Sequence, residues 1–337
     1  MKTRFIFALT LFFAVAGIIG AAIDKNERAT VTPVPLNAGQ IYAPTLLAAT
    51  KFRLYVFDER TNRLAVIERN TQKVALTGEI GTGRGQFFHP AAIAANEQGV
   101  VLFDILGNRF QFLNADGTFQ TECQLSEPTS SRTVALTAAG LVLVNTPSSD
   151  HVITAYDREC RKQSSFGPPA TLSELYSPAL SARDRDYKFA ANRLWLTGDK
   201  SGNTYAAYLL APVLTKYDKA GNLLWTRKFD QTREEQFRQY APKNGGMSTG
   251  VDGVQVPYMT KAVFPEEDGK VLVLCSVDLF RKDRIFEFSS AGDLVGYSDI
   301  EVPRGSLFKM TLQGHDLVLS ALFAPALYHA KLAEKQN

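Results

Sequence analysis

Short apolar runs separated by short polar turns recur along most of the chain. The pattern is clearest between residues 81 and 125, where turns rich in Gly, Asn and Asp separate the runs 91–95, 100–104, 109–114 and 118–125. Each run is too short for a typical helix, and its composition and flanking turn residues favour a β-strand. Four such strands within about forty residues make up one blade of a β-propeller.

Comparable runs return at the same spacing before and after this unit. Residues 46–81, 132–167, 189–229 and 262–300 each hold a similar set, and three more strands are expected after residue 307. Residues 29–36 are also β-prone, and their prolines suit an edge strand. We therefore predict an all-β fold, a six-bladed β-propeller of four-stranded antiparallel blades over residues 46–334. An N-terminal strand within residues 23–45 is expected to close the ring and to remove its free sheet edges. A seven-bladed ring would need a blade within residues 230–261, whose Gly, Pro and charge content argues against one.

Residues 81–119 also resemble a known repeat. They are similar to the NHL repeat, a blade type found in six-bladed propellers, through Gly81, Gly83, Gly85, Gln86, Phe87, Pro90, Ile93, Ala94, Gly99, Asp104, Asn108, Arg109, Gln111 and Gly117. The resemblance implies the same six-bladed architecture for this chain.

One spacing of polar residues occurs in both of the first two predicted blades. The two sets are Asp58, Asn62 and Arg63, and then Asp104, Asn108 and Arg109. An Asp that ends one strand and an Arg that starts the next can pair within the blade and fix the loop between them. We therefore interpret these six residues as a structural blade motif rather than as a glycosyl or phosphate site.

The N-terminus has the pattern of an export signal. Lys2 and Arg4 precede an apolar run over residues 5–19, and the small residues 20–22 follow it. This arrangement predicts a signal peptide over residues 1–22 and an exported protein, periplasmic or secreted. An uncleaved anchor is the alternative. No later run is long and apolar enough to span a membrane, so we expect no span after signal removal.

Charge and cysteine content narrow the classes of partner and fold. The 337 residues carry 37 Lys and Arg against 34 Asp and Glu, and this balance gives no electrostatic footprint for nucleic acid. Cys123 and Cys160 fall in neighbouring predicted blades, where they either pair or remain reduced. Cys275 lies in an apolar strand and is expected to be buried. The three cysteines are too few for a disulfide scaffold and match no metal-binding spacing.

Two insertions interrupt the blade period, at residues 168–188 and 230–261. Each precedes the first strand of a blade, so both are expected over the same mouth of the central channel, where binding loops commonly gather. Tyr and Arg are favoured at recognition sites. The candidate binding residues are His89, Tyr176, Arg183, Arg185, Tyr187, Arg233, Arg238, Tyr240 and Tyr258.

Catalytic motifs do not support an enzyme. The sequence has no GxSxG elbow, no CxxC pair and no Gly-rich phosphate loop, and its four His residues are not expected to converge on a zinc ion. Other six-bladed propellers with this resemblance include amidating lyases with His ligands and calcium-dependent lactonases, and no residues match either set. We therefore predict a non-catalytic binding module with no cofactor, catalytic residue or metal ligand, recognising a protein or a small molecule. The alternatives are a metal-dependent hydrolase or lyase, with His89 and a channel calcium ion as candidates, and a structural envelope protein.

Overall fold

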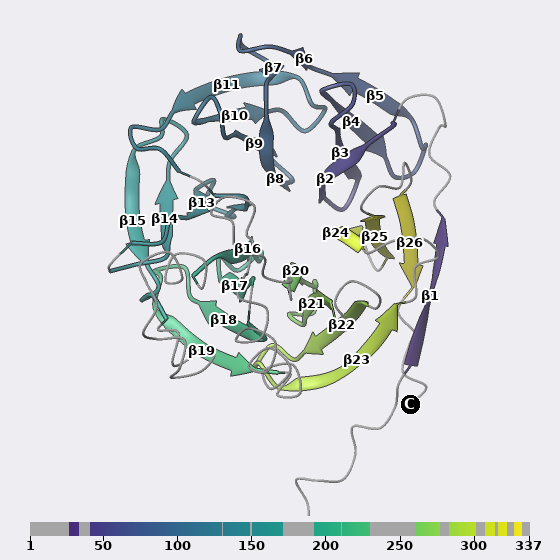
Figure 1. Ribbon diagram of the computed structural model, residues 1–337, viewed down its shortest axis with the longest axis vertical. Helices are drawn as coiled ribbons and strands as arrows, with labels where there is room; N and C mark the ends of the chain where they lie inside the picture. Colours follow the sequence, from purple (N-terminus) through teal and green to yellow (C-terminus); the bar gives the residue numbers. More distant parts are fainter. Residues whose placement is uncertain are drawn as a thin grey trace, which may run out of the picture.

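The protein is a ring of β-sheets arranged around a central axis (Figure 1). The computed structural model describes residues 27–33, 41–129, 131–148, 150–170, 192–209, 211–229, 260–276, 283–300, 307–313, 316–321 and 327–331. Every regular element in this part of the chain is a β-strand, so the predicted all-β propeller class is confirmed. Within the same ranges, no helix has the length and hydropathy needed to cross a bilayer.

Four of the sheets have four antiparallel strands each, which follow one another outward from the axis in chain order. The first two sheets comprise β2 (Pro44–Ala49), β3 (Arg53–Asp58), β4 (Arg63–Glu68) and β5 (Val74–Thr77), and then β8 (Pro90–Asn96), β9 (Gly99–Asp104), β10 (Arg109–Leu113) and β11 (Phe119–Gln124). The next two comprise β12 (Val134–Leu136), β13 (Val142–Asn145), β14 (Ile153–Tyr156) and β15 (Lys162–Phe166), and then β16 (Leu194–Gly198), β17 (Thr204–Tyr208), β18 (Val213–Tyr217) and β19 (Leu223–Lys228).

The remaining large sheet has eight strands and corrects our expectation of six separate sheets. Its order is β20 (Thr260–Pro265), β21 (Val271–Ser276), β22 (Asp283–Phe288), β23 (Leu294–Ile300), β1 (Glu27–Pro33), β26 (Leu327–Lys331), β25 (Asp316–Ala321) and β24 (Leu307–Gln313). The N-terminal strand β1 pairs antiparallel with β26 and parallel with β23. Because β1 is bonded on both edges, it fuses two antiparallel sets into one sheet, and the described strands form five large sheets instead of six.

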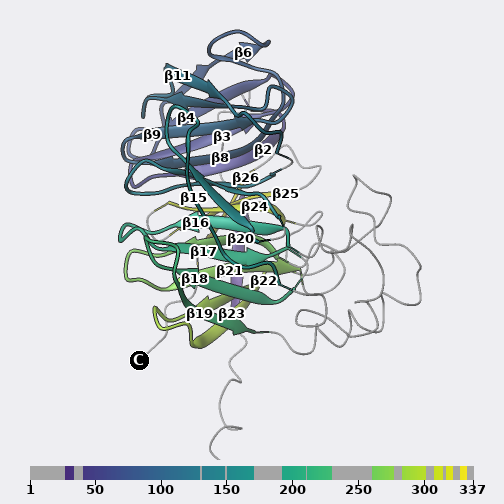
Figure 2. The ribbon, with the colours of Figure 1, turned by 90° about the vertical axis from the view of Figure 1, so that its left-hand side faces the viewer.

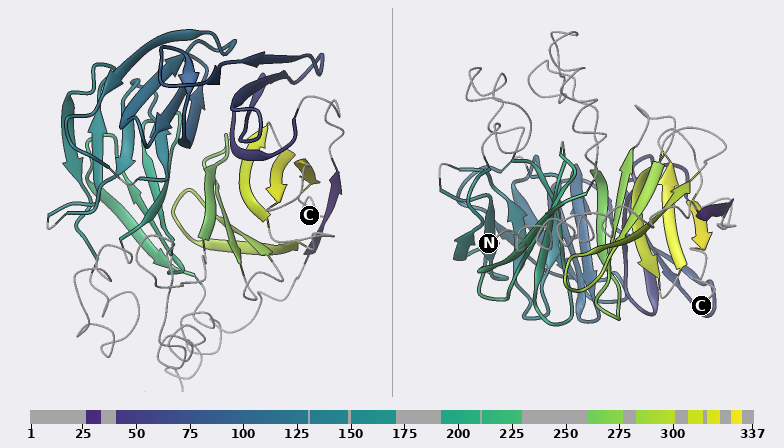
Figure 3. Two further views of the ribbon diagram at one scale, coloured as in Figure 1. Left: turned by 45° about the horizontal axis from the view of Figure 1, so that its top comes forward. Right: turned by 90° about the horizontal axis from the view of Figure 1, so that it is seen from below.

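The innermost strands surround the axis. Each of β2, β8, β12, β16, β20 and β24 contacts the next, and β24 contacts β2, so these strands form a closed inner ring. Each of them is also the edge strand of its sheet. Seen from below, the strands run roughly along the axis (Figure 3).

The hydrophobic core is divided among the interfaces between sheets. Neighbouring sheets lie face to face around the ring (Figure 2), and each buried cluster draws on two of them; Tyr55 and Phe57 of one sheet, for example, share a cluster with Leu102 of the next. Since both faces of the middle strands are covered, β3, β9 and β21 are nearly continuous apolar runs without alternation. The chain therefore builds a large fold from small repeated interfaces.

A glycine separates the outermost strand of the first sheet from a short strand that follows it. β5 ends at Thr77, and a short strand β6 (Glu79–Ile80) pairs in parallel with β7 (Gln86–Phe87). Gly78 separates β5 from β6 with a φ of 78°, and a Cβ at this position would meet the ring of Phe87. Glycine is required there because both the backbone conformation and the close ring exclude a side chain.

A disulfide joins neighbouring sheets. Cys123 of β11 is bonded to Cys160 in the turn between β14 and β15, with a Cα–Cα distance of 5.6 Å. This pairing decides the question that the sequence left open. Cys275 of β21 is buried, as expected.

Candidate functional site

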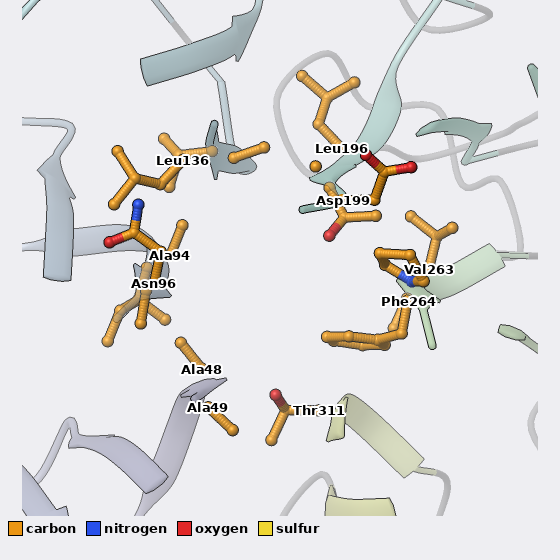
Figure 4. A pocket seen from close by; sticks show the side chains of 18 of the residues that line it. Ala48, Ala49, Ala94, Asn96, Leu136, Leu196, Asp199, Val263, Phe264 and Thr311 are labelled. Atoms are coloured by element: carbon orange, nitrogen blue, oxygen red, sulfur yellow. The ribbon is translucent and has the colours of Figure 1, made fainter. Parts of the chain in front are cut away.

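The innermost strands enclose a cavity of about 370 Å³ on the axis of the ring. Residues from all of these strands line it, including Thr311 of β24 (Figure 4). A volume of this size lies within the range of about 300–1,000 Å³ typical of small-molecule sites. The cavity is therefore a candidate site for a small molecule.

Small and apolar side chains dominate the wall of the cavity. Figure 4 shows Ala48, Ala94, Leu196 and Phe264 on different sides of the open space. The alanines of the lining are Ala48, Ala49, Ala92, Ala94, Ala95, Ala135, Ala138 and Ala262. Alanine is depleted in ordinary strands, and its use here leaves the axis open where larger β-formers would fill it.

One end of the cavity is bounded by the turns that follow the innermost strands, which we call the turn mouth. The backbone N–H of Lys51 donates to Glu97 Oε1 at 3.1 Å, which links the first two sheets. The Lys200 Nζ and Glu267 Oε1 atoms lie 2.7 Å apart and link two others. Exposed pairs of this kind contribute little stability, but they connect neighbouring turns around this mouth.

Asp199 at the turn mouth is held by the β16–β17 turn and by β17. Its carboxylate accepts bonds from the backbone and side-chain nitrogens of Asn203 at 2.8 and 2.7 Å, and from the Tyr205 hydroxyl at 3.2 Å. Burial, together with the nearby Asp199 charge, raises the pKa of Tyr205 well above its usual range. The tyrosine therefore stays protonated and acts as a donor, and Asp199 serves to fix the turn.

The opposite end, where the chain enters the innermost strands, is the leading mouth. Here Lys261 Nζ lies 2.6 Å from Asp283 Oδ1, and both side chains are buried. Thr260 pairs with Cys275 and Ala262 with Leu274, so Lys261 is the extra residue of a β-bulge. Bulges redirect a side chain, and this one brings Lys261 to the lining of the cavity. Burial lowers the pKa of Lys261, while Asp283 opposes the shift and keeps a countercharge beside the amine.

The two insertions leave and rejoin the ring at the leading mouth. Asn192 holds the base of the first, because its side-chain oxygen accepts the backbone N–H of Ala170 at 2.8 Å and its amide nitrogen donates to the Ala170 carbonyl at 3.0 Å. At the end of the second, the Trp195 indole N–H donates to the Thr260 carbonyl at 2.6 Å. These bonds fix the positions at which both insertions join the rigid ring.

The second copy of the blade motif forms the expected pair. Arg109 Nη2 lies 3.3 Å from Asp104 Oδ2, and Arg109 Nη1 lies 2.9 Å from Glu122 Oε2. The same guanidinium donates to the carbonyls of Thr82 and Gln86 at 2.7 and 3.0 Å. Arg109 thus ties the segment leading into the first strand of its sheet to the rest of that sheet.

The first copy of the motif is held differently. Arg63 is exposed, and the buried Asp58 carboxylate instead accepts backbone N–H groups of Tyr42, Ala43, Arg60 and Thr61. Both copies have an aspartate that accepts backbone N–H groups, since Asp104 also accepts those of Phe88 and Gly107. They also share the asparagine, because Asn62 and Asn108 have φ values of 53° and 45°. Asn tolerates this left-handed conformation better than most residues, which explains its place in the motif.

The predicted binding residues fall into two groups. His89 is exposed, and its carbonyl accepts the Ile105 N–H at 3.3 Å, which places it beside the leading mouth but outside the cavity lining. The other candidates lie outside the described residues: Tyr176, Arg183, Arg185, Tyr187, Arg233, Arg238, Tyr240 and Tyr258. Within the described ranges, no group of three or more His, Cys, Asp or Glu residues is placed to hold a metal ion.

Sequence reasoning missed the alanines of the cavity. Their signal was present in the composition of two first strands, PTLLAA and PAAIAAN, which carry alanine where strands usually carry larger residues. Only the closed inner ring shows that these positions from separate sheets meet around one space.

No family model matches the chain, and no curated protein is similar to it in sequence. Solved structures are similar in fold. A Bacteroides fragilis protein inferred to be exported has a TM-score of 0.58 at 13% identity, covering 94% of this chain and 98% of that one. A member of the DUF4221 family from Bacteroides vulgatus has a TM-score of 0.55 at 8% identity, covering 92% and 98%.

A catalytically inactive virginiamycin B lyase from Staphylococcus aureus, crystallised with quinupristin, has a TM-score of 0.54 at 10% identity, covering 91% of this chain and 100% of that one. At such identities the likeness extends to the fold alone. The chain therefore shares the β-propeller fold with proteins of different kinds.

Proposed function

We propose that the protein is an exported, non-catalytic binding module that takes a ligand into its central cavity through the leading mouth. The observation that carries the proposal is the cavity of about 370 Å³, which has an apolar wall and is lined by all the innermost strands. A rigid ring with variable loops at one mouth is a common arrangement for recognition.

The loops at the leading mouth supply specificity in this proposal. The support is the position of Ala170, Asn192 and Thr260, which join both insertions to the ring at that mouth. The Tyr and Arg residues of the insertions, together with His89, are the proposed contacts. Export is supported by the basic and apolar N-terminus.

The finer architecture is also part of the proposal. The two antiparallel halves of the eight-stranded sheet act as two blades, which gives an NHL-like ring of six. The support is that six innermost strands follow one another around the axis and that residues 81–119 resemble the NHL repeat.

The test is a thermal-shift screen of the mature protein with small molecules of anionic, cationic, polar and apolar classes. Any stabilising compound is then titrated against Ala94→Phe, which narrows the cavity, and against Ala75→Phe on the exposed face of β5. We expect binding to be lost in the first variant and retained in the second. Equal binding to both variants, or no stabilising compound of any class, contradicts the proposal.

A deletion tests the contribution of the loops. Removing residues 173–186 leaves the Ala170–Asn192 clamp in place, so the ring should keep its circular dichroism spectrum and lose affinity for the same compound. Unchanged affinity would remove the first insertion from the site.

A further inference from the structure

We infer that the central cavity is built for a neutral, mainly apolar small molecule that carries a few uncharged hydrogen-bonding groups. The inference rests on the proposed function and specifies the ligand class of the same cavity. It depends on three properties of the described residues, namely the wall, the charges at the mouths and the free edges of the innermost strands.

The wall offers contact surface without a charge in its middle. Figure 4 shows Ala48, Ala94, Leu136, Val263 and Phe264 around the open space. A ligand in this position exchanges water for apolar contacts, and the hydrophobic effect favours that exchange in proportion to the apolar area removed from water. An apolar ligand therefore matches the wall, whereas an ion placed there loses its hydration without gaining a partner.

The charged residues of the cavity lining sum to zero as a whole, and Lys261, Lys200 and Asp199 have partners of their own. The lining contains four basic and four acidic residues. Lys261 is bonded to Asp283, and Lys200 to Glu267. Asp199 is occupied by donors from its own turn and from β17. A ligand with a net charge would have to compete with these contacts, and the balanced lining gives no excess charge to attract it.

The free edges of the innermost strands account for the neutral polar groups. Each of these strands is the edge of its sheet, so one row of backbone N–H and C=O groups faces away from the sheet. Neighbouring sheets take up part of this row, because the Leu194 and Leu196 N–H groups donate to Asn145 Oδ1 and Thr133 Oγ1. Such groups need hydrogen-bond partners when water is displaced. An amide, amine or hydroxyl on an otherwise apolar ligand can supply them without introducing a charge.

A matched pair of fluorescent probes tests the ligand class. Phenylnaphthylamine is neutral and apolar and carries one N–H group, and anilinonaphthalene sulfonate adds a single negative charge to the same framework. Both are titrated into the mature wild-type protein and into the Ala94→Phe and Ala75→Phe variants. We expect saturable binding of the neutral probe with one site per chain, at least tenfold tighter than the sulfonate. This binding should be at least tenfold weaker in Ala94→Phe and unchanged in Ala75→Phe.

A measurement without a variant guards against misfolding of Ala94→Phe. A neutral aryl diazirine is photolysed with the wild-type protein, and the labelled peptides are located by mass spectrometry. We expect label on β2, β8 and β20, which line the cavity, and its suppression by phenylnaphthylamine. Label that is confined to the outer strands β5, β11 and β19 overturns the inference.

The outcomes separate the ligand class from the proposed function. If the sulfonate binds at least as tightly as the neutral probe, and Ala94→Phe weakens its binding, the ligand class is wrong while a binding cavity stands. If neither probe binds in the cavity and the broader screen also finds no ligand, both proposals fail.

Discussion

The disulfide between Cys123 and Cys160 offers a quantitative test of the ring, because it joins β11 of one sheet to the β14–β15 turn of the next. The perturbation is the double variant Cys123→Ala/Cys160→Ala. It removes the covalent link and leaves the hydrogen bonding of both sheets in place. Any loss of stability therefore reports mainly on the link between neighbouring sheets.

The expected loss of stability follows from the length of the loop that the disulfide closes. The two cysteines are 37 residues apart, and the chain-entropy model gives about 4 kcal/mol for a loop of this size at 25 °C. A chain of about 300 residues has an unfolding entropy of about 0.6 kcal/mol/K. The double variant should therefore melt about 6 °C below the oxidised wild type.

The β14–β15 turn that holds Cys160 has the same hydrogen bond as the last turn of three other antiparallel sets, and this likeness provides a second variant. Cys160 donates its backbone N–H to Asp157, as Gly117, Gly221 and Gly292 donate to the first residues of their own turns. Cys160 has a φ of 59°, and the three glycines have φ values of 85–88°. A left-handed conformation costs a non-glycine residue about 1–2 kcal/mol. Cys123→Ala/Cys160→Gly should therefore recover about 1 kcal/mol, or about 2 °C, relative to Cys123→Ala/Cys160→Ala.

Differential scanning calorimetry of the two variants and of the wild type, with and without a phosphine reductant, measures these effects. The reductant should lower the melting temperature of the wild type and leave both variants unchanged. Cys275 remains in every sample and controls for effects of the reductant on a buried thiol. The reasoning is refuted if the first variant melts within about 1 °C of the oxidised wild type, or if the glycine variant is no more stable than the alanine variant.

Three further changes address the turns, the blade motif and a buried tyrosine. Gly117→Ala should lower the free energy of unfolding, measured in urea, by about 1–3 kcal/mol more than Gly140→Ala. A Cβ at Gly117 would lie 2.6 Å from Val66, whereas no described atom lies within 4 Å of a Cβ at Gly140. Equal losses in the two variants would contradict this packing argument. Arg109→Met should cost about 3–5 kcal/mol because it leaves buried Asp104 without its cation, whereas exposed Arg63→Met should change stability by less than about 0.5 kcal/mol; similar urea midpoints would refute the difference between the two motif copies. Burial raises the pKa of Tyr217 to about 12, so folding favours the protonated phenol. The contribution of this group to the free energy of unfolding is complete below about pH 10, its ordinary pKa, and is lost as the pH rises toward 12. Tyr217→Phe should remove about 2–3 kcal/mol of this alkaline loss in urea unfolding, and an unchanged pH profile would count against the assignment.

The strand pattern was predictable because it depends on neighbours along the chain. The predicted runs at residues 100–104 and 109–114 correspond to β9 and β10. Turn residues such as Gly117 and Gly221 impose their conformations locally, so they mark the ends of strands in any fold that the chain adopts. The predicted class of four-stranded antiparallel sheets around an axis therefore follows from local sequence and a repeated period.

Contacts between segments that are distant in the sequence were harder to predict. Arg63 and Arg109 occupy the same place in the motif, yet only Arg109 is buried against an acidic partner. The difference arises from the carbonyls of Thr82 and Gln86, which the loop before β8 brings to Arg109. A motif read along one strand contains no information about the loop that will cover it.

The number of sheets and the position of the cavity belong to the tertiary structure alone. Residues 29–36 could be expected to hold a closing strand, but pairing of β1 with both β23 and β26 depends on where the ends of the ring meet. The alanines at positions 48, 94 and 262 likewise have no common neighbour in the sequence. The sequence by itself determined the strands, the turns and the blade period, because these follow from local propensity and hydrophobic spacing. Ring closure decided the fused sheet and the cavity, because both are formed by residues that meet only when the first and last strands come together.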